Sequence, residues 1–300
     1  ILKKKTVKKT NRIKFKIINN LKDLYYDKKV IGWIPNPGQN FIIDNSVINF
    51  FPNLQVIVTP STGNNHINLK DCRNNSIKVF SLMDKKNDLK KITASSEFTF
   101  LKILNSLRHI ERGYNEVKNG KWRENENYMR GRQLNNKNIG IIGMGRIGKN
   151  IAKWSKAFGA SVNYYDPFVF TKNFKSISIK KIFSQSDIIC LCCTYNKYTH
   201  HLINSNLLNL MKKNSILINT SRGEIINEES LINLIKKRKD IEIHLDVLSG
   251  EVTNTQFKSK LINFHNSNRI KITPHISGAT IESQNLAAKI AIDILEKNIA

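Results

Sequence analysis

Cysteine is scarce in this chain of 300 residues, which contains only four. Cys190, Cys192 and Cys193 fall together in one short apolar run, where a thiol packs as a small hydrophobic side chain. No second pair of cysteines or histidines at zinc-finger spacing completes a metal site, so we expect no bound metal. So few cysteines also fit a protein of the cytoplasm, where disulfides are rare.

Long apolar runs are missing as well. Residues 188–193, among the most apolar, have the length of a strand, whereas a membrane-spanning helix needs about 20 apolar residues. The first residues lack the apolar core of a secretory signal. With 40% hydrophobic residues, the chain is long enough to bury two separate cores. We therefore expect a two-domain globular protein of the cytoplasm with no membrane partner.

Acidic residues are few: 23 Asp and Glu stand against 49 Lys and Arg, so the formal net charge is +26. Such a balance is typical of nucleic-acid-binding proteins. The lysines are nevertheless spread through every segment, beside many asparagines and isoleucines, which indicates nucleotide bias in the coding sequence more than a binding patch. The one dense run, residues 3–9, is expected to be a solvated terminal segment. Nucleic acid is therefore not an expected partner, although the charge favours anionic substrates.

What the sequence does contain is a stretch, residues 138–166, with the order strand, glycine turn, helix, strand and terminal acid. Gly143, Gly145 and Gly148 follow the first strand at the G-x-G-x-x-G spacing. The first glycine permits a tight turn, the second lets a pyrophosphate approach the backbone, and the third lets the helix pack closely on the strand. This order predicts a dinucleotide-binding βαβ unit.

Other residues of this unit indicate which nucleotide it binds. The pyrophosphate would rest on free N–H groups at the helix N-terminus, around Arg146 and Ile147. Gly159 stands where the helix is expected to end. Asp166, at the end of the second strand, would accept hydrogen bonds from the ribose hydroxyls and repel a 2′-phosphate, so NAD is favoured over NADP. A glycine-rich turn without a ligand is the alternative, but strand, helix, helix end and acid all agree.

Strands separated by helix-sized segments continue towards the C-terminus. This alternation predicts an α/β fold with a doubly wound, mostly parallel sheet and right-handed crossovers. The expected strands cover residues 187–193, 215–219, 241–247 and 270–273, and the expected helices cover residues 207–211 and 228–239.

Ahead of the glycine turn the order is less regular. We expect a first domain formed by residues 1–103 with residues 278–300, and an NAD-binding domain formed by residues 104–277. Thr280 is the expected N-cap of a final amphipathic helix. The other elements expected here are strands over residues 30–34, 55–58 and 77–80, a long helix over residues 95–117 and the final helix over residues 280–299.

Three polar residues, Arg222, Glu251 and His275, each follow a predicted strand, and ligands of doubly wound sheets bind beyond the carboxyl ends of the strands. Singly, each has an ordinary structural explanation, as a turn arginine, a surface glutamate and a histidine at a bend. Beside a dinucleotide site they form a set suited to hydride transfer. An arginine holds a carboxylate through two parallel hydrogen bonds, and a histidine takes or returns a hydroxyl proton. A neighbouring acid favours the imidazolium.

Four separated motifs resemble the D-isomer-specific 2-hydroxyacid dehydrogenases, and ASSEFTF and NGKW, ahead of the nucleotide domain, are most similar to the phosphoglycerate dehydrogenase-like branch. The four motifs are GIIGMGRIG with YDPF, INTSRGEIINEESL, LDVLSGE and ITPHISGAT. The resemblance implies that Arg222 binds the substrate carboxylate and carbonyl, that His275 is the acid/base and that Glu251 assists it. It also implies that Asp246 contacts the nicotinamide amide.

The resemblance extends to the first domain, where TPSTGNNHI is similar to a substrate-binding loop and points to Ser61, Thr62 and Gly63. The implied fold there is flavodoxin-like. Because the chain starts at Ile1 and residues 12–18 resemble the second strand of that fold, we expect this domain to be truncated at its N-terminus. Ala300 is expected to end inside the closing helix.

Some positions depart from the family pattern. Val252 stands where the family usually has proline, and Cys192 and Thr194 stand where it often has histidine and proline. These departures bear on cofactor affinity and substrate preference more than on reaction class.

The implied function is an NAD-dependent oxidoreductase that interconverts a small D-2-hydroxy acid and its 2-oxo acid, of the phosphoglycerate, hydroxypyruvate or glyoxylate type, and works as a homodimer. The alternative from another class is an NAD-sensing binding protein of co-repressor type without turnover. Retention of all three catalytic-type residues weighs against it. A formate- or phosphonate-oxidising relative on the same scaffold also stays open.

Overall fold

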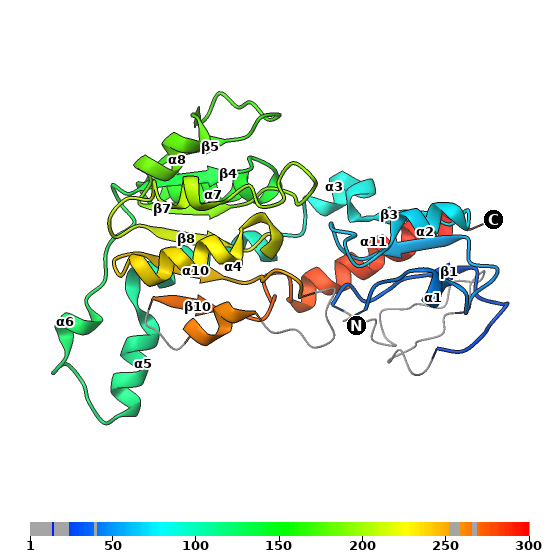
Figure 1. Ribbon diagram of the computed structural model, residues 1–300, viewed down its shortest axis with the longest axis horizontal. Coiled ribbons are helices and arrows are strands. Elements are labelled where there is room, and N and C mark those ends of the chain that lie inside the picture. Colours follow the sequence, from blue (N-terminus) through cyan, green and yellow to red (C-terminus); the bar gives the residue numbers. More distant parts are fainter. Residues whose placement is uncertain (1–13, 15–23, 39–40, 252–258, 266–268, 300) are drawn as a thin grey trace. The chain divides into compact units, whose positions relative to one another are not determined.

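The computed structural model describes residues 14, 24–38, 41–251, 259–265 and 269–299. The chain divides into two compact units (Figure 1). The first comprises Ile1–Thr93, Gly250–Phe257 and Gly278–Ala300, and the second comprises Ala94–Ser249 and Lys258–Ser277. None of the described helices is long and apolar enough to cross a membrane.

The second unit is built on a seven-stranded sheet in which all neighbouring strands are parallel. The strand order is β10-β9-β8-β7-β4-β5-β6, so the chain winds outward from β4 on one side and then from β7 on the other. This confirms the predicted doubly wound sheet, with its switch point between β4 and β7. The strands are β4 (Asn138–Ile142), β5 (Ser161–Tyr165), β6 (Lys175–Ser176), β7 (Ile188–Leu191), β8 (Ile216–Asn219), β9 (Glu242–Leu245) and β10 (Ile270–Ile272).

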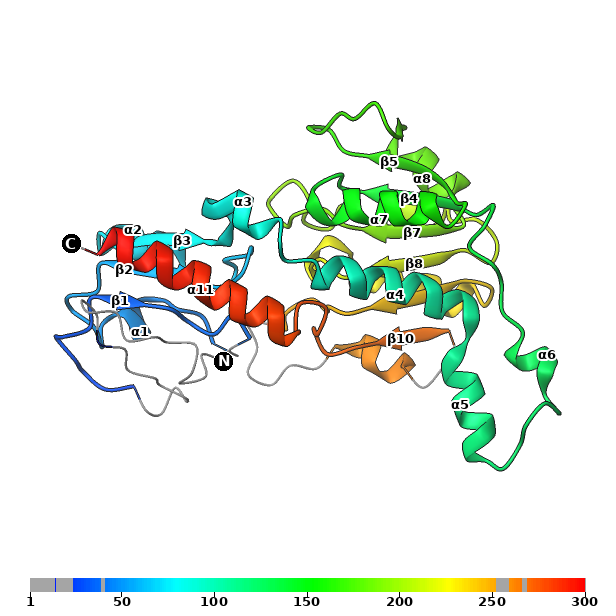
Figure 2. The ribbon, with the colours of Figure 1, turned by 180° about the vertical axis from the view of Figure 1, so that it is seen from behind.

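Helices cover both faces of this sheet, which is why its central strands are apolar apart from Asn138 and Asn219 at their ends. Every residue of β7 and β8 is buried. Figure 2 shows α4 (Ala94–Arg108) and α7 (Arg146–Ala157) side by side on one face, where Phe100, Ile103 and Ile151 join the core. The other helices of the sheet are α8 (Ile179–Gln185), α9 (Ser205–Leu208) and α10 (Glu228–Lys237).

The first unit ends at Thr93, ten residues before the predicted domain boundary at residue 103. The reason is that α4 packs on α7, β8 and β9 and so belongs entirely to the second unit. Sequence patterns place a boundary poorly where a helix leads from one unit directly into the next.

The single helix predicted over residues 95–117 is wrong, because the chain breaks at His109. This residue has a left-handed φ of +51°, which is uncommon outside glycine. A new helix, α5 (Ile110–Lys118), starts there and is joined to the sheet edge by an ion pair between Glu111 and Lys271 of β10. With α6 (Glu126–Met129) it forms an arm, residues 110–129, that extends from the second unit (Figure 1).

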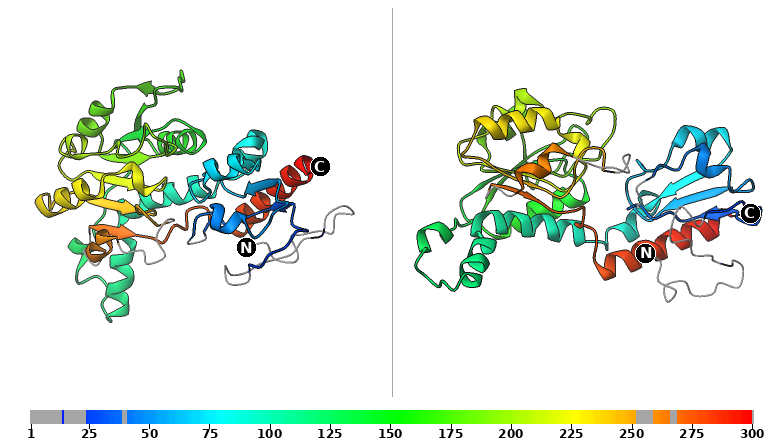
Figure 3. Two further views of the ribbon diagram at one scale, coloured as in Figure 1. Left: turned by 45° about the vertical axis from the view of Figure 1, so that its right-hand side comes forward. Right: turned by 60° about the horizontal axis from the view of Figure 1, so that its bottom comes forward.

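The first unit has a parallel three-stranded sheet in the order β1-β2-β3. Its long helix α11 (Ile281–Asn298) packs on β2, and Thr280 caps it by accepting a hydrogen bond from Ser283 N, as predicted (Figure 3). The strand predicted over residues 12–18 lies outside the described residues except for Lys14. The remaining elements are β1 (Gly32–Trp33), β2 (Val56–Thr59), β3 (Lys78–Ser81), α1 (Asn45–Ile48), α2 (Leu69–Asn74) and α3 (Lys86–Leu89).

Candidate active site

The glycine turn lies between β4 and α7, and its three glycines differ in what surrounds them. Gly143 has a φ of +95°, and a Cβ there would lie 2.6 Å from the backbone N and Cα of Cys193. A Cβ on Gly148 would collide with the carbonyl oxygen of Gly143. At Gly145 no described atom lies within 4 Å of the Cβ position. The protein's own packing therefore requires two of the glycines, while the middle one keeps open the side where a pyrophosphate would approach.

The N-terminus of α7 is suited to an anion. Gly145 is its N-cap and makes no side-chain capping bond, and the first turn, with Arg146 and Ile147, carries no acidic residue. The first N–H groups of a helix have no partners within it and bear partial positive charge. Burial lowers the pKa of the Arg146 guanidinium, which an arginine tolerates while staying charged. These features fit a diphosphate of NAD.

Asp166, at the end of β5, joins the glycine turn to the loop that follows. Its Oδ2 accepts a hydrogen bond from Met144 N at 2.7 Å. Its Oδ1 accepts from Phe168 N at 2.9 Å and from Val169 N at 3.0 Å. The acid is thus fixed beside the turn, and a carboxylate has further lone pairs that could accept from ribose hydroxyls.

Arg222 lies just beyond β8 in a loop held by its neighbours. Asn219 Nδ2 donates to Arg222 O at 2.9 Å, and Ser221 Oγ donates to Leu191 O at 2.8 Å. Gly223 is required because a Cβ there would collide with the backbone of Leu248 and Ser249. The arginine loop is therefore packed against the segment that leads to Glu251.

His275 follows β10 and is exposed, with a left-handed φ of +51°. Its backbone N donates to Asp246 O at 2.8 Å and to Thr273 O at 3.0 Å. Asp246 follows the neighbouring strand β9 and is 1% exposed. Its carboxylate accepts hydrogen bonds on both sides of the histidine: from Thr273 Oγ1 at 2.5 Å, from Ile276 N at 3.1 Å and from Ser277 N at 2.8 Å.

The structure places Glu251 and the loop of Ser61, Thr62 and Gly63 in the first unit. In that loop Ser61 Oγ donates to Gly63 O at 2.5 Å, and Ser61 O accepts from Leu82 N at 3.0 Å. The second unit carries Arg222, Asp246 and His275. The assistance of His275 by Glu251 and the role of the serine loop stay predictions, and Val252 lies outside the described residues.

Sequence reasoning missed one buried cation beside this site, Lys102 of α4. It is 6% exposed, and its Nζ donates to Leu245 O at 3.4 Å. Burial lowers the pKa of Lys102, while the charges of Asp246 and Glu111 act to raise it. A signal was present: Lys102 lies between Phe100 and Ile103 on the helix face that fills the core.

Cys190 lies in β7 and Cys193 follows it, and both thiols are largely shielded from water. Burial raises the pKa of Cys190 to about 12 and that of Cys193 to about 11, so both are protonated at neutral pH. In the described ranges, no three His, Cys, Asp or Glu side chains are grouped as a metal site would need.

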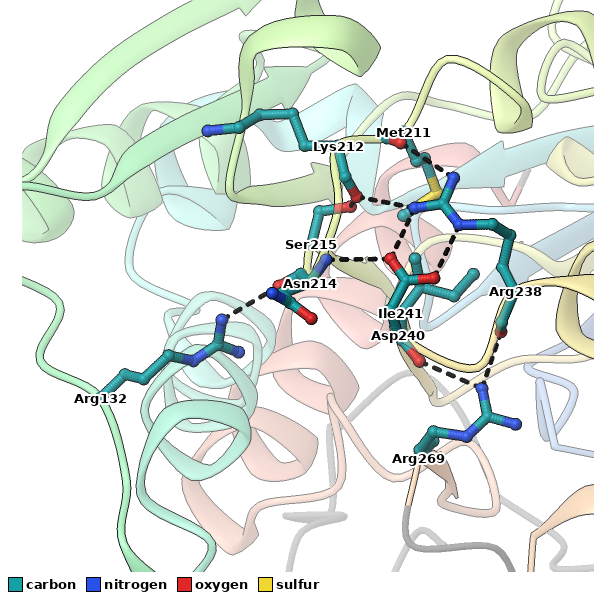
Figure 4. Close-up of polar contacts among 9 residues, drawn as sticks. All are labelled: Arg132, Met211, Lys212, Asn214, Ser215, Arg238, Asp240, Ile241 and Arg269. Carbon is teal, nitrogen blue, oxygen red and sulfur yellow. Dashed lines mark hydrogen bonds and ion pairs between the residues drawn. The ribbon is translucent and has the colours of Figure 1, made fainter.

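The amino ends of the same strands carry a different polar cluster (Figure 4). Arg238 binds Asp240 through Nε and an outer nitrogen, each at 2.7 Å from a carboxylate oxygen. Asp240 also accepts from Asn214 N at 3.1 Å, and Arg269 donates to the carbonyl oxygens of Arg238 and Ile241. The arginine holds the pKa of Asp240 well below its usual range.

The sequence matches a family of known enzymes. Residues 100–277, more than half of the chain, match the family described as D-isomer specific 2-hydroxyacid dehydrogenase, NAD binding domain. The chain is 32% identical over 257 residues to a glyoxylate reductase of Thermofilum pendens, covering 83% of this chain and 73% of that protein. It is 30% identical over 247 residues to a hydroxypyruvate reductase of Thermotoga maritima, covering 82% and 76%.

Solved structures agree with this assignment. A D-lactate dehydrogenase from Aquifex aeolicus, complexed with NAD and lactic acid, has a TM-score of 0.75 at 26% identity, covering 89% of this chain and 82% of that one. An NAD-dependent formate dehydrogenase from Staphylococcus aureus, in complex with NAD, has a TM-score of 0.76 at 26% identity, covering 90% and 79%. With the glycine turn, the acid at the end of β5 and the arginine and histidine loops in place, the chain belongs to the D-isomer specific 2-hydroxyacid dehydrogenases, which are NAD-dependent oxidoreductases.

Proposed function

We propose that the protein reduces a small 2-oxo acid of the glyoxylate or hydroxypyruvate type to the D-2-hydroxy acid and catalyses the reverse reaction. The observation that carries this proposal is the position of Arg222 and His275. Both lie just beyond the carboxyl ends of strands, β8 and β10, of the sheet whose β4 ends in the glycine turn. The residues proposed to bind the substrate carboxylate and the cofactor thus lie at the carboxyl ends of strands in one sheet. The phosphoglycerate type is a further member of the same substrate class.

In the proposed mechanism Arg222 orients the substrate by holding its carboxylate with parallel charge-assisted hydrogen bonds. His275 donates a proton to the carbonyl oxygen during reduction and takes it from the hydroxyl during oxidation. Glu251 assists the histidine by favouring the imidazolium. The glycine turn, Arg146, Ile147 and Asp166 would hold NAD, which would supply or accept the hydride.

The experiment measures NADH oxidation over a panel of glyoxylate, hydroxypyruvate, pyruvate and phosphohydroxypyruvate, with NAD reduction by formate alongside. His275→Gln should lower kcat on the best substrate by about a hundredfold or more, with NADH affinity retained. His200→Gln is the matched control, because His200 is exposed and contacts Tyr195. Unchanged kcat in His275→Gln would remove this residue from the mechanism. NADH binding without turnover would favour the NAD-sensing alternative.

The homodimer belongs to the same proposal. The arm, residues 110–129, exposes large side chains: Tyr114 is 73% exposed, Val117 54% and Trp122 72%. Exposed apolar and aromatic side chains of this size are typical of an interface. Sedimentation velocity should find a dimer that Trp122→Ser dissociates, whereas Tyr198→Ser, at a residue 75% exposed outside the arm, leaves it intact. The cytoplasmic location stays a prediction.

A further inference from the structure

We propose that Asp246 is a positioning residue for His275: its buried carboxylate holds the loop of residues 273–277 in the one conformation that presents the imidazole to substrate. The proposal rests on the proposed function, in which His275 moves the proton. The resemblance implies a different role for this acid, a direct contact with the nicotinamide amide. The two roles make different predictions.

The hydrogen bonds around Asp246 converge on the histidine from both sides. Before His275, Thr273 donates its hydroxyl to the carboxylate at 2.5 Å. After it, the N–H groups of Ile276 and Ser277 donate at 3.1 and 2.8 Å. The backbone of Asp246 completes the set, because its carbonyl oxygen accepts from His275 N at 2.8 Å. One residue therefore makes four contacts to a turn of five residues.

This turn needs such an anchor. His275 has a φ of +51°, a conformation that a non-glycine residue keeps only where its surroundings impose it. The histidine side chain itself is exposed, so core packing does not hold it. The backbone sets the direction in which the imidazole leaves the chain, and Asp246 hydrogen-bonds to that backbone.

A buried cation, Lys102, lies near the charge of Asp246. A buried carboxylate needs hydrogen bonds and a counter-charge. Lys102 provides the charge from α4, where its Nζ donates to the carbonyl oxygen of Leu245, the residue before Asp246. A lysine in the middle of an apolar helix face is otherwise costly, and the nearby acid offsets part of that cost.

The test is a double-mutant cycle of Asp246→Asn with His275→Gln, read out as kcat and as NADH affinity. An asparagine keeps the shape and one acceptor oxygen, but its NH₂ group cannot accept from a backbone N–H. We expect Asp246→Asn alone to lower kcat about a hundredfold, with the KM for NADH within about twofold of wild type. In the His275→Gln background it should add less than about a twofold loss, because both changes disable the same group.

A second cofactor separates the two roles. When an acetyl group replaces the nicotinamide carboxamide, the amide donor is gone. If Asp246 acts through His275, the ratio of kcat/KM for NADH to that for the acetyl analogue is the same in wild type and in Asp246→Asn. Losses that multiply in the cycle, or a ratio that collapses towards one, would overturn the proposal and assign Asp246 to the nicotinamide.

Two further variants keep the test valid if Asp246→Asn folds poorly. Thr273→Val removes one hydroxyl donor and should lower kcat about fivefold, again without effect in the His275→Gln background. Asp187→Asn is the control, since Asp187 also accepts a backbone hydrogen bond, from Asn138 N at 2.8 Å, but at the amino ends of the strands. It should lower stability and leave kcat unchanged. An inactive wild-type protein would contradict the proposed function, whereas an active one with an additive cycle contradicts only the role of Asp246.

Discussion

The amino ends and the carboxyl ends of the strands in the seven-stranded sheet form two edges, called here the amino edge and the carboxyl edge. The two edges use the same residue types for different purposes. At the amino ends of the strands, Asp240 is bound by Arg238 on both oxygens, and Asp187 accepts from Lys212 Nζ at 2.6 Å. At the carboxyl ends, Asp166 and Asp246 instead accept hydrogen bonds from backbone N–H groups of loops. Acids at the amino ends form ion pairs besides accepting from backbone N–H groups, whereas these bonds of Asp166 and Asp246 go to the loops that they hold in place.

This difference follows from the direction of parallel strands. All the loops that leave the carboxyl ends lie at one edge. The polar side chains of these loops are therefore close enough together to bind one ligand. At the other edge the chain enters the strands, so its polar groups serve to end helices and start strands. Residue type alone therefore does not identify a functional acid or arginine in this fold; the end of the strand on which it lies does.

The largest effect that would sharpen the comparison is expected at its two arginines. Arg222→Gln should lower kcat/KM by about a thousandfold, because two charge-assisted hydrogen bonds to the substrate carboxylate, each worth roughly 2 kcal/mol, are lost. Arg238→Gln breaks an equally complete set of contacts at the amino edge, including bonds to the carbonyl oxygens of Met211 and Lys212. It should lower the melting temperature and leave kcat/KM unchanged where the protein is folded.

Steady-state kinetics with the best oxo acid of the panel, together with thermal unfolding, checks this pair. The proposed difference between the two edges would be wrong if Arg238→Gln lost catalytic efficiency at a temperature where its far-UV circular dichroism spectrum is native. It would also be wrong if Arg222→Gln changed stability alone.

A smaller effect separates the glycines of the turn at the carboxyl edge. Gly148→Ala should destabilise the fold by about 1–3 kcal/mol, since the new methyl group meets the carbonyl oxygen of Gly143. Gly145→Ala should leave stability unchanged and weaken NADH binding about tenfold, because its methyl group meets no described atom of the protein and faces the approach of the diphosphate.

NADH fluorescence titration and thermal unfolding distinguish the two glycine variants. Gly113→Ala is the control, since its Cβ also meets no described atom within 4 Å but lies in α5. It should raise stability slightly through helix propensity and leave NADH affinity alone. A loss of stability in Gly145→Ala with normal affinity would show that the middle glycine serves packing as well.

Much of the second unit could be predicted from sequence because its signals are local. The glycine turn, the apolar strands on either side of it and the acid of β5 lie within residues 138–166, and each signal supports the others. The break of the helix at His109 could not be predicted, because no proline or glycine stands at residues 107–111 and the ion pair of Glu111 with Lys271 joins residues far apart in the sequence. Elements of two to four residues, such as β6 and α6, contain too few positions to show a period.

For the site, the positions of residues relative to strand ends could be predicted, but their hydrogen-bond partners could not. Motif order placed Arg222 and His275 beyond strand ends, which requires only that the sheet be parallel. The contacts of Asp246 with Thr273, Ile276 and Ser277 depend on the register of two strands, in which Leu245 pairs with Ile272. Register is a property of packing that no local pattern contains. The same holds for Lys102, because its bond to the carbonyl oxygen of Leu245 depends on how α4 packs on β9.

The smallest expected effect is a dependence of stability on pH at the amino edge. Asp240 has a pKa held below its usual range by the Arg238 guanidinium and by Asn214 N–H. A group with a depressed folded pKa adds stability above its unfolded pKa, about 3.9 for aspartate, and loses that stability as the pH falls through the folded value. Asp240→Asn should therefore lower the free energy of unfolding by about 1 kcal/mol at pH about 7, as for an ion pair that water still reaches in part.

The difference between wild type and Asp240→Asn should shrink as the pH falls below about 4 and vanish once Asp240 is protonated in both states. Urea unfolding of the two proteins at a series of pH values measures it. Activity at neutral pH should be equal, since no catalytic group is touched. A difference that stays constant down to low pH would mean that Asp240 acts through its hydrogen bonds as a neutral group would, and that charge is not what distinguishes the amino edge from the carboxyl edge.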